Sequence, residues 1–197
     1  MSFALGLTGS IGMGKSTTAK LFAEAGCDVW DADAAVHRLY QTGGAAVEPM
    51  AGLCPAAVAE GFVDRSVLKE LISQDKTLLP EIEKIVHPLV QADRTAFRAA
   101  ATSDILVFDI PLLFETGGES AMDAVACVFV DAETQRARVL ARGTMTEEQF
   151  AQIRAKQMPI AEKLAKSDYK IETDTLEHAA AQVEEVLADI RRRMSHA

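Results

Sequence analysis

Short apolar runs alternate along this chain with stretches that have helical spacing. The apolar runs that predict strands are residues 3–9, 27–33, 104–110, 124–132 and 167–173. Two of them contain the continuous apolar stretches ILVF and CVFV, which are typical of strands covered on both faces in a parallel sheet. Residues 15–25 and 176–194 have the spacing of helices that bury one face. The alternation predicts an α/β fold with a doubly wound, five-stranded parallel sheet.

Two polar regions with helical patches interrupt the alternation. Residues 41–101 contain no convincing strand, and residues 143–166 are polar and helical. We interpret both regions as helical insertions over one edge of the sheet, within a single domain that spans residues 1–197. The core of that domain is then made of residues 1–40, 102–142 and 167–197.

The size and composition of the chain are those of an ordinary globular domain. Its 197 residues are 49% apolar and 25% charged, and its formal net charge is −9. Nonspecific binding to nucleic acid needs a basic surface, so this charge argues against a nucleic-acid partner. No apolar run approaches the length of a membrane span, and the first residues do not resemble a signal peptide. We therefore expect a cytoplasmic protein that does not bind membranes.

The three cysteines are predicted to be small buried hydrophobic residues. Cys27, Cys54 and Cys127 lie far apart in the sequence, and they form neither a Cys-x-x-Cys pair nor a zinc-type spacing with histidine. A disulfide framework or a zinc site is therefore not expected.

The segment GSIGMGKS, residues 9–16, matches the phosphate-loop pattern G-x-x-x-x-G-K-[ST] and lies between a predicted strand and a predicted helix. Glycines let successive backbone amides turn inward around an anion, and the positive end of the following helix adds to the field. Lys15 is expected to reach the β- and γ-phosphates, and the Ser16 hydroxyl to bind Mg²⁺. A glycine-rich turn that binds nothing is the alternative, but such a turn has no need of Lys15 and Ser16. The predicted ATP-binding residues are Gly12, Met13, Gly14, Lys15, Ser16 and Thr17.

Two acidic positions near strand ends are further candidates. Asp109 ends the run ILVFD, where phosphate-loop proteins place the acid that holds Mg²⁺, although an aspartate that begins a turn is also common there. Asp31 and Asp33 lie at the carboxyl end of the second predicted strand, where ligands of open α/β sheets gather. One of the two is expected to cap a helix that starts at Ala34, and the other to orient or deprotonate an acceptor hydroxyl. We favour Asp33 for the chemical role.

Cationic side chains and missing signatures narrow the class of nucleotide enzyme. The chain has no asparagine and no Thr-Lys-x-Asp sequence, which excludes the guanine signature of a GTPase. Arg138 and Arg142 lie four residues apart, hence on one helical face, just before the second polar insertion. Arginines on a mobile lid could neutralise charge during phosphoryl transfer, although such a pair can also be a solvated face. A small-molecule kinase is the remaining interpretation.

Five segments in this order resemble the dephospho-CoA kinase family: GLTGSIGMGKS, DAD, EKIVHPLV, DIPLLFE and QMPIAEK. The similarity runs from about residue 4 to residue 175, and DIPLLFE is far more specific than the phosphate loop. The resemblance implies a P-loop fold in which residues 41–101 bind the acceptor and residues 143–166 form a lid. It also implies transfer of the γ-phosphoryl group of ATP, with Mg²⁺, to the ribose 3′-hydroxyl of dephospho-CoA, the last step of coenzyme A synthesis.

The same resemblance implies roles for individual residues. Asp33 would be the base at the acceptor hydroxyl, and Arg142, with Arg138, would act from the lid. The residues implied to line the acceptor site are Arg65, His87 and the stretch 112–115 with Leu112 and Phe114. Without the family likeness, His87 would be read as a structural histidine before Pro88, and the apolar residues of the stretch as core.

Three positions depart from the family pattern. Gly143 replaces the usual Asp or Asn after the lid arginine, which would loosen the lid. The segment KIETDTLEH lacks the Asn and Gly that many members carry near the adenine, so no adenine contacts are assigned. Met13 replaces a commoner serine at a position that contributes mainly its backbone. Two alternatives stay open, namely another small kinase on the same scaffold and an ATP-binding regulatory module without turnover; the oligomeric state is also open.

Overall fold

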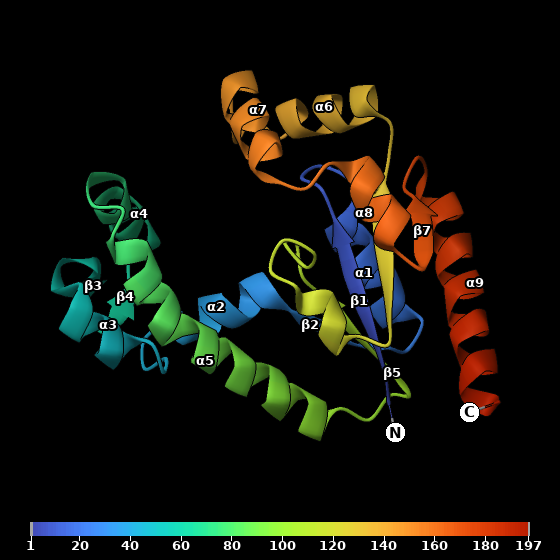
Figure 1. The fold of residues 1–197 in the computed structure, drawn as a ribbon, viewed down its shortest axis with the longest axis horizontal. Coiled ribbons are helices and arrows are strands. Elements are labelled where there is room, and N and C mark those ends of the chain that lie inside the picture. The colour runs from blue at the N-terminus through green and yellow to red at the C-terminus, as the bar shows by residue number, and fades with distance from the viewer. Residues whose placement is uncertain (1, 197) are drawn as a thin grey trace. The chain divides into compact units, whose positions relative to one another are not determined.

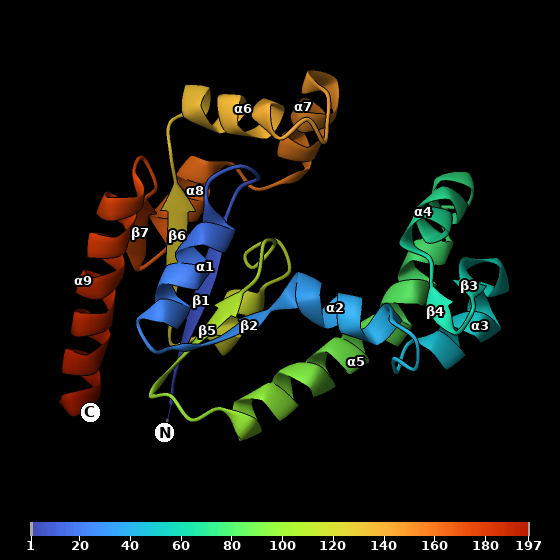
Figure 2. The same cartoon turned by 180° about the vertical axis from the view of Figure 1, so that it is seen from behind.

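The computed structural model describes residues 2–196, which divide into two compact units. The first unit holds the described residues up to Trp30 and those from Ala101 onward, and the second unit is Asp31–Ala100. Figures 1 and 2 show the elements of both from opposite sides. Each unit has its own apolar core, because the two main clusters of buried hydrophobic residues each draw their members from one unit only.

A five-stranded sheet forms the centre of the first unit. Its strands are β1 (Phe3–Gly9), β2 (Asp28–Asp31), β5 (Ile105–Asp109), β6 (Ala124–Phe129) and β7 (Tyr169–Glu172). They are arranged in the order β2-β5-β1-β6-β7, and β1 runs parallel to both of its neighbours. Every residue of β5 is buried, as the continuous apolar run ILVF predicted. The expected α/β fold with a doubly wound sheet is confirmed.

The first unit also contains helices. They are α1 (Lys15–Glu24), α6 (Ala132–Ala141), α7 (Glu147–Lys156), α8 (Ile160–Lys166) and α9 (Leu176–Ser195), with a short 3₁₀ helix, η2 (Gly118–Ala121). Helix α1 lies on one face of the sheet and α8 on the other, as the two opposite views show. The core cluster of this unit contains three fully buried side chains from its helices, namely Phe22 of α1 and Leu187 and Ile190 of α9.

The register of the central strands determines which residues meet at the edge of the sheet. Leu7 of β1 pairs with Asp109 of β5, two residues before β1 ends at Gly9. Parallel strands end at the same edge of a sheet, so Asp109 lies beside the point where the chain leaves β1 for the phosphate loop.

The second unit is mainly helical. Its elements are α2 (Ala32–Tyr40), α3 (Val47–Leu53), α4 (Arg65–Gln74), α5 (Leu78–Ala100), the 3₁₀ helix η1 (Pro55–Ala57) and the strands β3 (Val58–Ala59) and β4 (Phe62–Val63). Helix α2 therefore belongs to this unit together with residues that the sequence assigned to the acceptor insertion. The side chains of Met50, Ile82 and Val86 are buried in its separate core.

The expectation that residues 41–101 hold no strand is wrong. Strands β3 and β4 pair antiparallel, with Val58 opposite Val63. The two residues that join them, Glu60 and Gly61, have φ angles of 50° and 80°, as a tight hairpin turn of type I′ requires. Strands of two residues each are too short to show an alternating pattern, which is why the sequence did not reveal them.

Two other expectations can be compared directly with the structure. Cys27, Cys54 and Cys127 are buried free thiols, as predicted. Among the described helices, none combines the length with the apolar content that crossing a bilayer requires.

Candidate active site

The phosphate loop turns sharply at two glycines before α1 begins. Gly12 and Gly14 have φ angles of 77° and 83°, a left-handed conformation that side chains with a Cβ atom rarely adopt. A Cβ atom at Gly12 would also lie 2.4 Å from Cγ2 of Val139. No side chain of the described chain caps α1. The amides of its first turn are therefore left for a ligand, as expected for an anion-binding helix N-terminus.

Lys15 forms an ion pair with Asp109 at the sheet edge. The Asp109 side chain is 2% exposed and that of Lys15 is 15% exposed, so the pair is largely removed from water. The structure thus brings together the two charged groups that the sequence placed at the phosphate and at the metal.

The donor chemistry at this edge fits Mg²⁺. The Ser16 hydroxyl is exposed at the second residue of α1, and Asp109 supplies a buried carboxylate. Hydroxyl, carboxylate and water oxygens are the ligands that Mg²⁺ takes at phosphate sites. Both residues can therefore hold the ion, directly or through water.

Two glutamine side chains fix the first part of the loop. The Gln135 amide nitrogen donates a hydrogen bond of 2.7 Å to the Ile11 carbonyl, and the Ile11 amide donates one of 3.2 Å to the Gln157 carbonyl oxygen. Gln135 comes from α6 and is 2% exposed, and Gln157 ends α7. Sequence reasoning missed both contacts, because the residues lie more than 120 positions from Ile11.

Both predicted lid arginines line a cavity of about 280 Å³ beside the phosphate loop. The other lining residues are Gly14, Thr17, Thr18, Thr173, Thr175, Leu176 and Ala179. The Arg138 guanidinium donates hydrogen bonds to the Thr173 side-chain and backbone oxygens, at 3.1 and 2.6 Å. Arg138 is therefore held to the chain after β7, whereas Arg142 makes no hydrogen bond or ion pair with the described residues.

Thr173 connects this cavity to the loop. Its hydroxyl donates a hydrogen bond of 2.9 Å to the carbonyl of Met13, and the residue is 7% exposed. Met13 contributes more than its backbone, because its side chain is 2% exposed and packs in the main core. Sequence reasoning did not identify Thr173. It lies in the segment KIETDTLEH, to which the sequence analysis assigned no adenine contact.

Gly143 ends α6 in a left-handed conformation. Its φ is 65°, and its amide donates to the carbonyl of Leu140. A residue with this conformation stops a helix, and asparagine is among the few residues besides glycine that tolerate it. Gly143 therefore has a backbone conformation that the asparagine found in other family members could also adopt.

The two acids of DAD have different environments. Strand β2 ends at Asp31 and α2 starts at Ala32, two residues earlier than predicted. The Asp31 carboxylate caps α2 by accepting a hydrogen bond of 2.9 Å from the amide of Ala34. Asp33 is exposed in the first turn of α2, and its carboxylate makes no hydrogen bond or ion pair with any described residue. The cap is thus Asp31, and Asp33 is free for a ligand.

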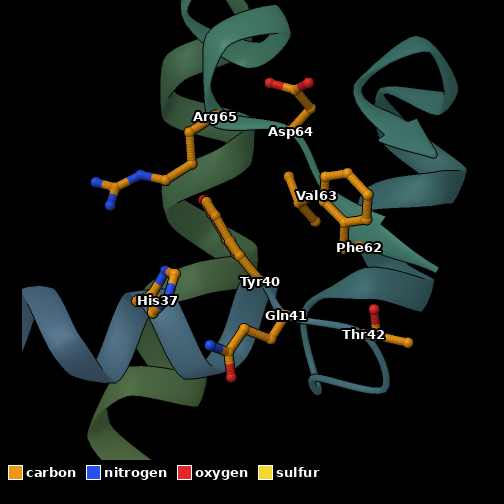
Figure 3. Close-up of a pocket in the computed structure, with 8 residues that line it drawn as sticks. All are labelled: His37, Tyr40, Gln41, Thr42, Phe62, Val63, Asp64 and Arg65. Carbon is orange, nitrogen blue, oxygen red and sulfur yellow. The ribbon is translucent and has the colours of Figure 1, made fainter. Parts of the chain in front are cut away.

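The second unit contains a larger cavity, of about 590 Å³, next to α2 and the start of α4. Its lining residues are His37, Tyr40, Gln41, Thr42, Phe62, Val63, Asp64 and Arg65, and Figure 3 shows how their side chains lie. Burial raises the pKa of the Tyr40 hydroxyl, and the nearby Arg65 charge opposes this only in part. Arg65 therefore stands at a cavity, as an acceptor residue should, whereas His87 is an exposed residue of α5 that does not line it.

The apolar residues after β5 differ in exposure. Leu112 is 43% exposed, whereas Phe114 is 7% exposed and packs with Leu113 and Val125. The Lys166 ammonium lies 5.9 Å from the centre of the Phe114 ring. Leu112 can therefore contact a ligand directly, and Phe114 chiefly supports the segment from below.

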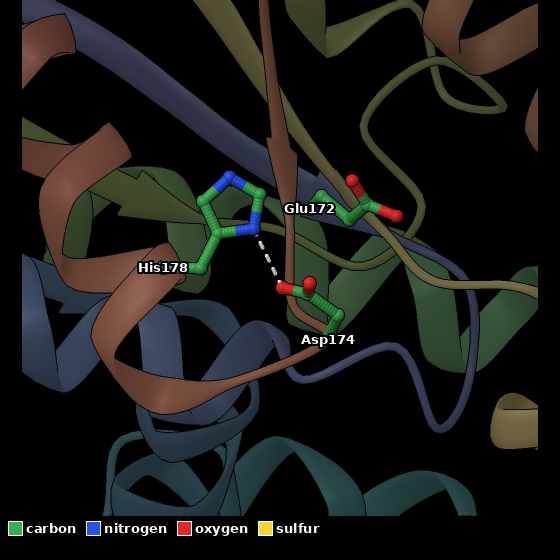
Figure 4. A group of neighbouring side chains, drawn as sticks. All are labelled: Glu172, Asp174 and His178. Atoms are coloured by element: carbon green, nitrogen blue, oxygen red, sulfur yellow. Dashed lines mark hydrogen bonds and ion pairs between the residues drawn. The ribbon is translucent and has the colours of Figure 1, made fainter.

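Glu172, Asp174 and His178 form a group that resembles a metal site in composition (Figure 4). Nδ1 of His178 lies 2.7 Å from a carboxylate oxygen of Asp174, and the same oxygen accepts the amide of Thr175, the N-cap of α9. Asp174 and His178 are about half exposed. Stabilisation of the first turn of α9 accounts for this arrangement.

The fold, the phosphate loop and the paired Lys15 and Asp109 define the class of P-loop kinases.

Residues 3–178 match the model of the dephospho-CoA kinase family. The chain is 65% identical to a dephospho-CoA kinase from Ruegeria pomeroyi, over 100% of both chains. It is similar to a solved structure from Thermus thermophilus, with a TM-score of 0.86 and 31% identity over 95% of this chain and 97% of that one. A solved dephospho-CoA kinase from Campylobacter jejuni has the same fold, with a TM-score of 0.69 and 23% identity over 96% and 98% of the two chains. The chain belongs to the dephospho-CoA kinase family.

Proposed function

We propose that the protein transfers the γ-phosphoryl group of ATP to the ribose 3′-hydroxyl of dephospho-CoA, which gives coenzyme A and ADP. The observation that carries the proposal is the Lys15–Asp109 pair at the edge of the sheet, in a chain whose family match covers residues 3–178. Phosphate-loop enzymes use a lysine and an acid of this kind to hold the transferring phosphoryl group and its metal, which supports the proposal.

ATP binds with its phosphates in the loop. The amides of residues 12–17 surround the phosphate oxygens, and Lys15 moves from Asp109 to the β- and γ-phosphates. When bound at Ser16 and Asp109, Mg²⁺ neutralises charge that develops on the phosphate oxygens. The nucleoside enters the cavity of Arg138 and Thr173, because that cavity adjoins Gly14 and Thr17, where the α-phosphate end of the nucleotide leaves the loop.

The acceptor reacts through its 3′-hydroxyl. Asp33 accepts the hydroxyl proton while the oxygen attacks the γ-phosphorus atom, and the bond from that atom to the β–γ bridging oxygen breaks. The unpaired carboxylate of Asp33 supports this role. Arg142, with no partner among the described residues, is available to neutralise charge on the transferring group, and residues 143–166 act as the lid that excludes water.

The rest of dephospho-CoA binds to residues 41–101 and to the segment after β5. Arg65 faces a cavity in the second unit and supplies a positive charge for the diphosphate. Leu112 offers an exposed apolar surface, with Phe114 beneath it, and His87 is the least supported of the acceptor residues because it is exposed away from the cavity lining. The reaction takes place in the cytoplasm.

Mass analysis of the product tests the proposal. The protein is incubated with ATP, Mg²⁺ and dephospho-CoA, and in parallel with nucleoside monophosphates and small sugar alcohols. We expect a product one phosphoryl group heavier than dephospho-CoA, identical in retention to authentic coenzyme A, together with an equal amount of ADP. Preferred phosphorylation of another acceptor would indicate a different small kinase. ATP binding without ADP release for any acceptor would indicate a regulatory module.

A further inference from the structure

A buried ion pair joins helix α8 to the segment that follows β5. The Lys163 ammonium, on α8, lies 2.9 Å from Oε1 of Glu115, and the Lys163 side chain is 0% exposed. The same ammonium donates a hydrogen bond of 3.1 Å to the carbonyl of Pro111. Glu115 and Pro111 both lie in the segment that follows Asp109, so the pair joins that segment to α8.

Glu115 is ionised in this environment. Burial alone raises the pKa of its carboxyl group, but the hydrogen bonds from Lys163 and from the amide of Met158 outweigh burial and lower the pKa below its ordinary value. Both Lys163 and the amide of Met158 contact Oε1 of Glu115. The other carboxylate oxygen, Oε2, is buried and has no hydrogen-bond partner among the described residues. A buried charge is costly unless it is paired, so the pair defines one arrangement of the two segments.

Two paths of hydrogen bonds and backbone lead from the pair towards the phosphate loop. Oε1 of Glu115 accepts a hydrogen bond of 2.8 Å from the amide of Met158. The preceding residue is Gln157, and its side-chain oxygen accepts a hydrogen bond from the amide of Ile11. In addition, Thr8 directly precedes Gly9, the first residue of the loop pattern, and its hydroxyl donates a bond of 3.1 Å to the carbonyl of Pro111.

We propose that Glu115 and Lys163 are positioning residues for the phosphate loop, and that Glu115 acts by fixing the Gln157–Met158 turn so that Gln157 orients the Ile11 peptide. The loop binds phosphate through consecutive amides, whose directions depend on the orientation of each peptide plane. The pair also ties α8 to the segment that follows β5. This inference rests on the proposed binding of ATP at the loop.

Two double variants separate positioning from simple stability. Both E115Q/K163M and E115L/K163M remove the two charges together, which avoids a single unpaired buried charge. They differ at position 115, where glutamine can still accept the amide of Met158 and leucine cannot. The exposed pair Glu81 and Lys84 on α5, 2.6 Å apart, provides the control variant E81Q/K84M.

The readout is the dissociation constant of Mg-ATP, measured by calorimetry, with circular dichroism as the check that each variant is folded. We expect E115L/K163M to bind Mg-ATP about fivefold more weakly than E115Q/K163M, which is the effect of roughly one hydrogen bond. Both double variants should be folded by circular dichroism, and E81Q/K84M should bind ATP as the wild type does.

A third variant, Q157L, tests the last step without disturbing the ion pair. We expect it to weaken Mg-ATP binding to a similar degree, and to cause no further loss when combined with E115L/K163M, because both changes break the same path. Equal ATP affinity in the two double variants, or full additivity with Q157L, would overturn the positioning role. If the wild type itself does not bind Mg-ATP, the proposed function fails first, which distinguishes the two failures.

Discussion

Lys15 and Asp109 contact each other through their charged groups, although 94 positions separate them in the sequence. The contact follows from the parallel pairing of β1 with β5, in which Asp109 stands opposite Leu7. One strand leads into the phosphate loop and the other ends in the acid. The strand order therefore places the Lys15 ammonium and the Asp109 carboxylate at the same edge of the sheet.

Replacing Lys15 by alanine should remove most turnover. The ammonium stabilises charge on the phosphate oxygens in the transition state, and loss of one such group lowers kcat by about 10²- to 10³-fold. Steady-state kinetics with dephospho-CoA measures the effect, and circular dichroism checks that the variant is folded. Near-normal kcat in folded Lys15→Ala protein would contradict the role of this residue.

The two acids of DAD should respond differently to substitution. Asp33→Asn should lower kcat by about 10²- to 10⁴-fold, the usual effect of removing a general base, without a change in KM for ATP. Asp31→Ala is the matched control. It removes the cap of α2 and should lower the free energy of unfolding by about 1 kcal/mol while kcat is kept. The base assignment is wrong if Asp33→Asn leaves both kinetic parameters unchanged.

Thr173→Val should raise the KM for ATP. The change keeps the shape of the side chain but removes the hydroxyl that contacts the Met13 carbonyl and the Arg138 guanidinium. The buried carbonyl then loses its partner, and the free energy of unfolding should fall by about 1–3 kcal/mol. Thr173→Ser, which restores the hydroxyl, should recover the KM. Equal KM values for ATP in the wild type and the valine variant would show that the hydroxyl does not position the site.

The stability of the protein should depend on Glu115 in acid. Because the pKa of this carboxyl is lowered in the folded state, its stabilisation is fully present above the ordinary glutamate pKa of about 4.3 and is lost as the pH falls through the lower, folded value. Below about pH 4.3 the wild type should therefore lose stability relative to E115Q/K163M, which has no carboxyl group at position 115. Urea titrations between neutral and acid pH measure it, and a difference that does not change with pH would contradict the lowered pKa.

The thiols should be unreactive in the folded protein. Burial raises the pKa of Cys27 and of Cys127 to about 11, and that of Cys54 is raised for the same reason. Since the thiolate is the reactive form, a thiol reagent at pH 8 should label the native protein very slowly and all three cysteines after unfolding in urea. Rapid labelling of any cysteine in native protein would show that its burial is incomplete.

The sequence predicted much of the first unit because its signals are local. Continuous apolar runs identified the strands, and the spacing of Lys15 and Ser16 after the glycines identified the loop. The β3–β4 hairpin was missed because two-residue strands leave no period to detect. The boundary at DAD was two residues late because helix ends are set by individual capping bonds, here that of Asp31.

By itself, the sequence determined the strand–loop–helix that binds phosphate and the family to which the chain belongs, because both depend on residue types at fixed spacing. Only the tertiary structure decided which acid caps α2, that Phe114 is largely buried while Leu112 is exposed, and that Thr173 and Gln157 contact the loop. These depend on contacts between segments far apart in the chain. No local pattern encodes such contacts, because they form only when the strands are paired and the helices packed.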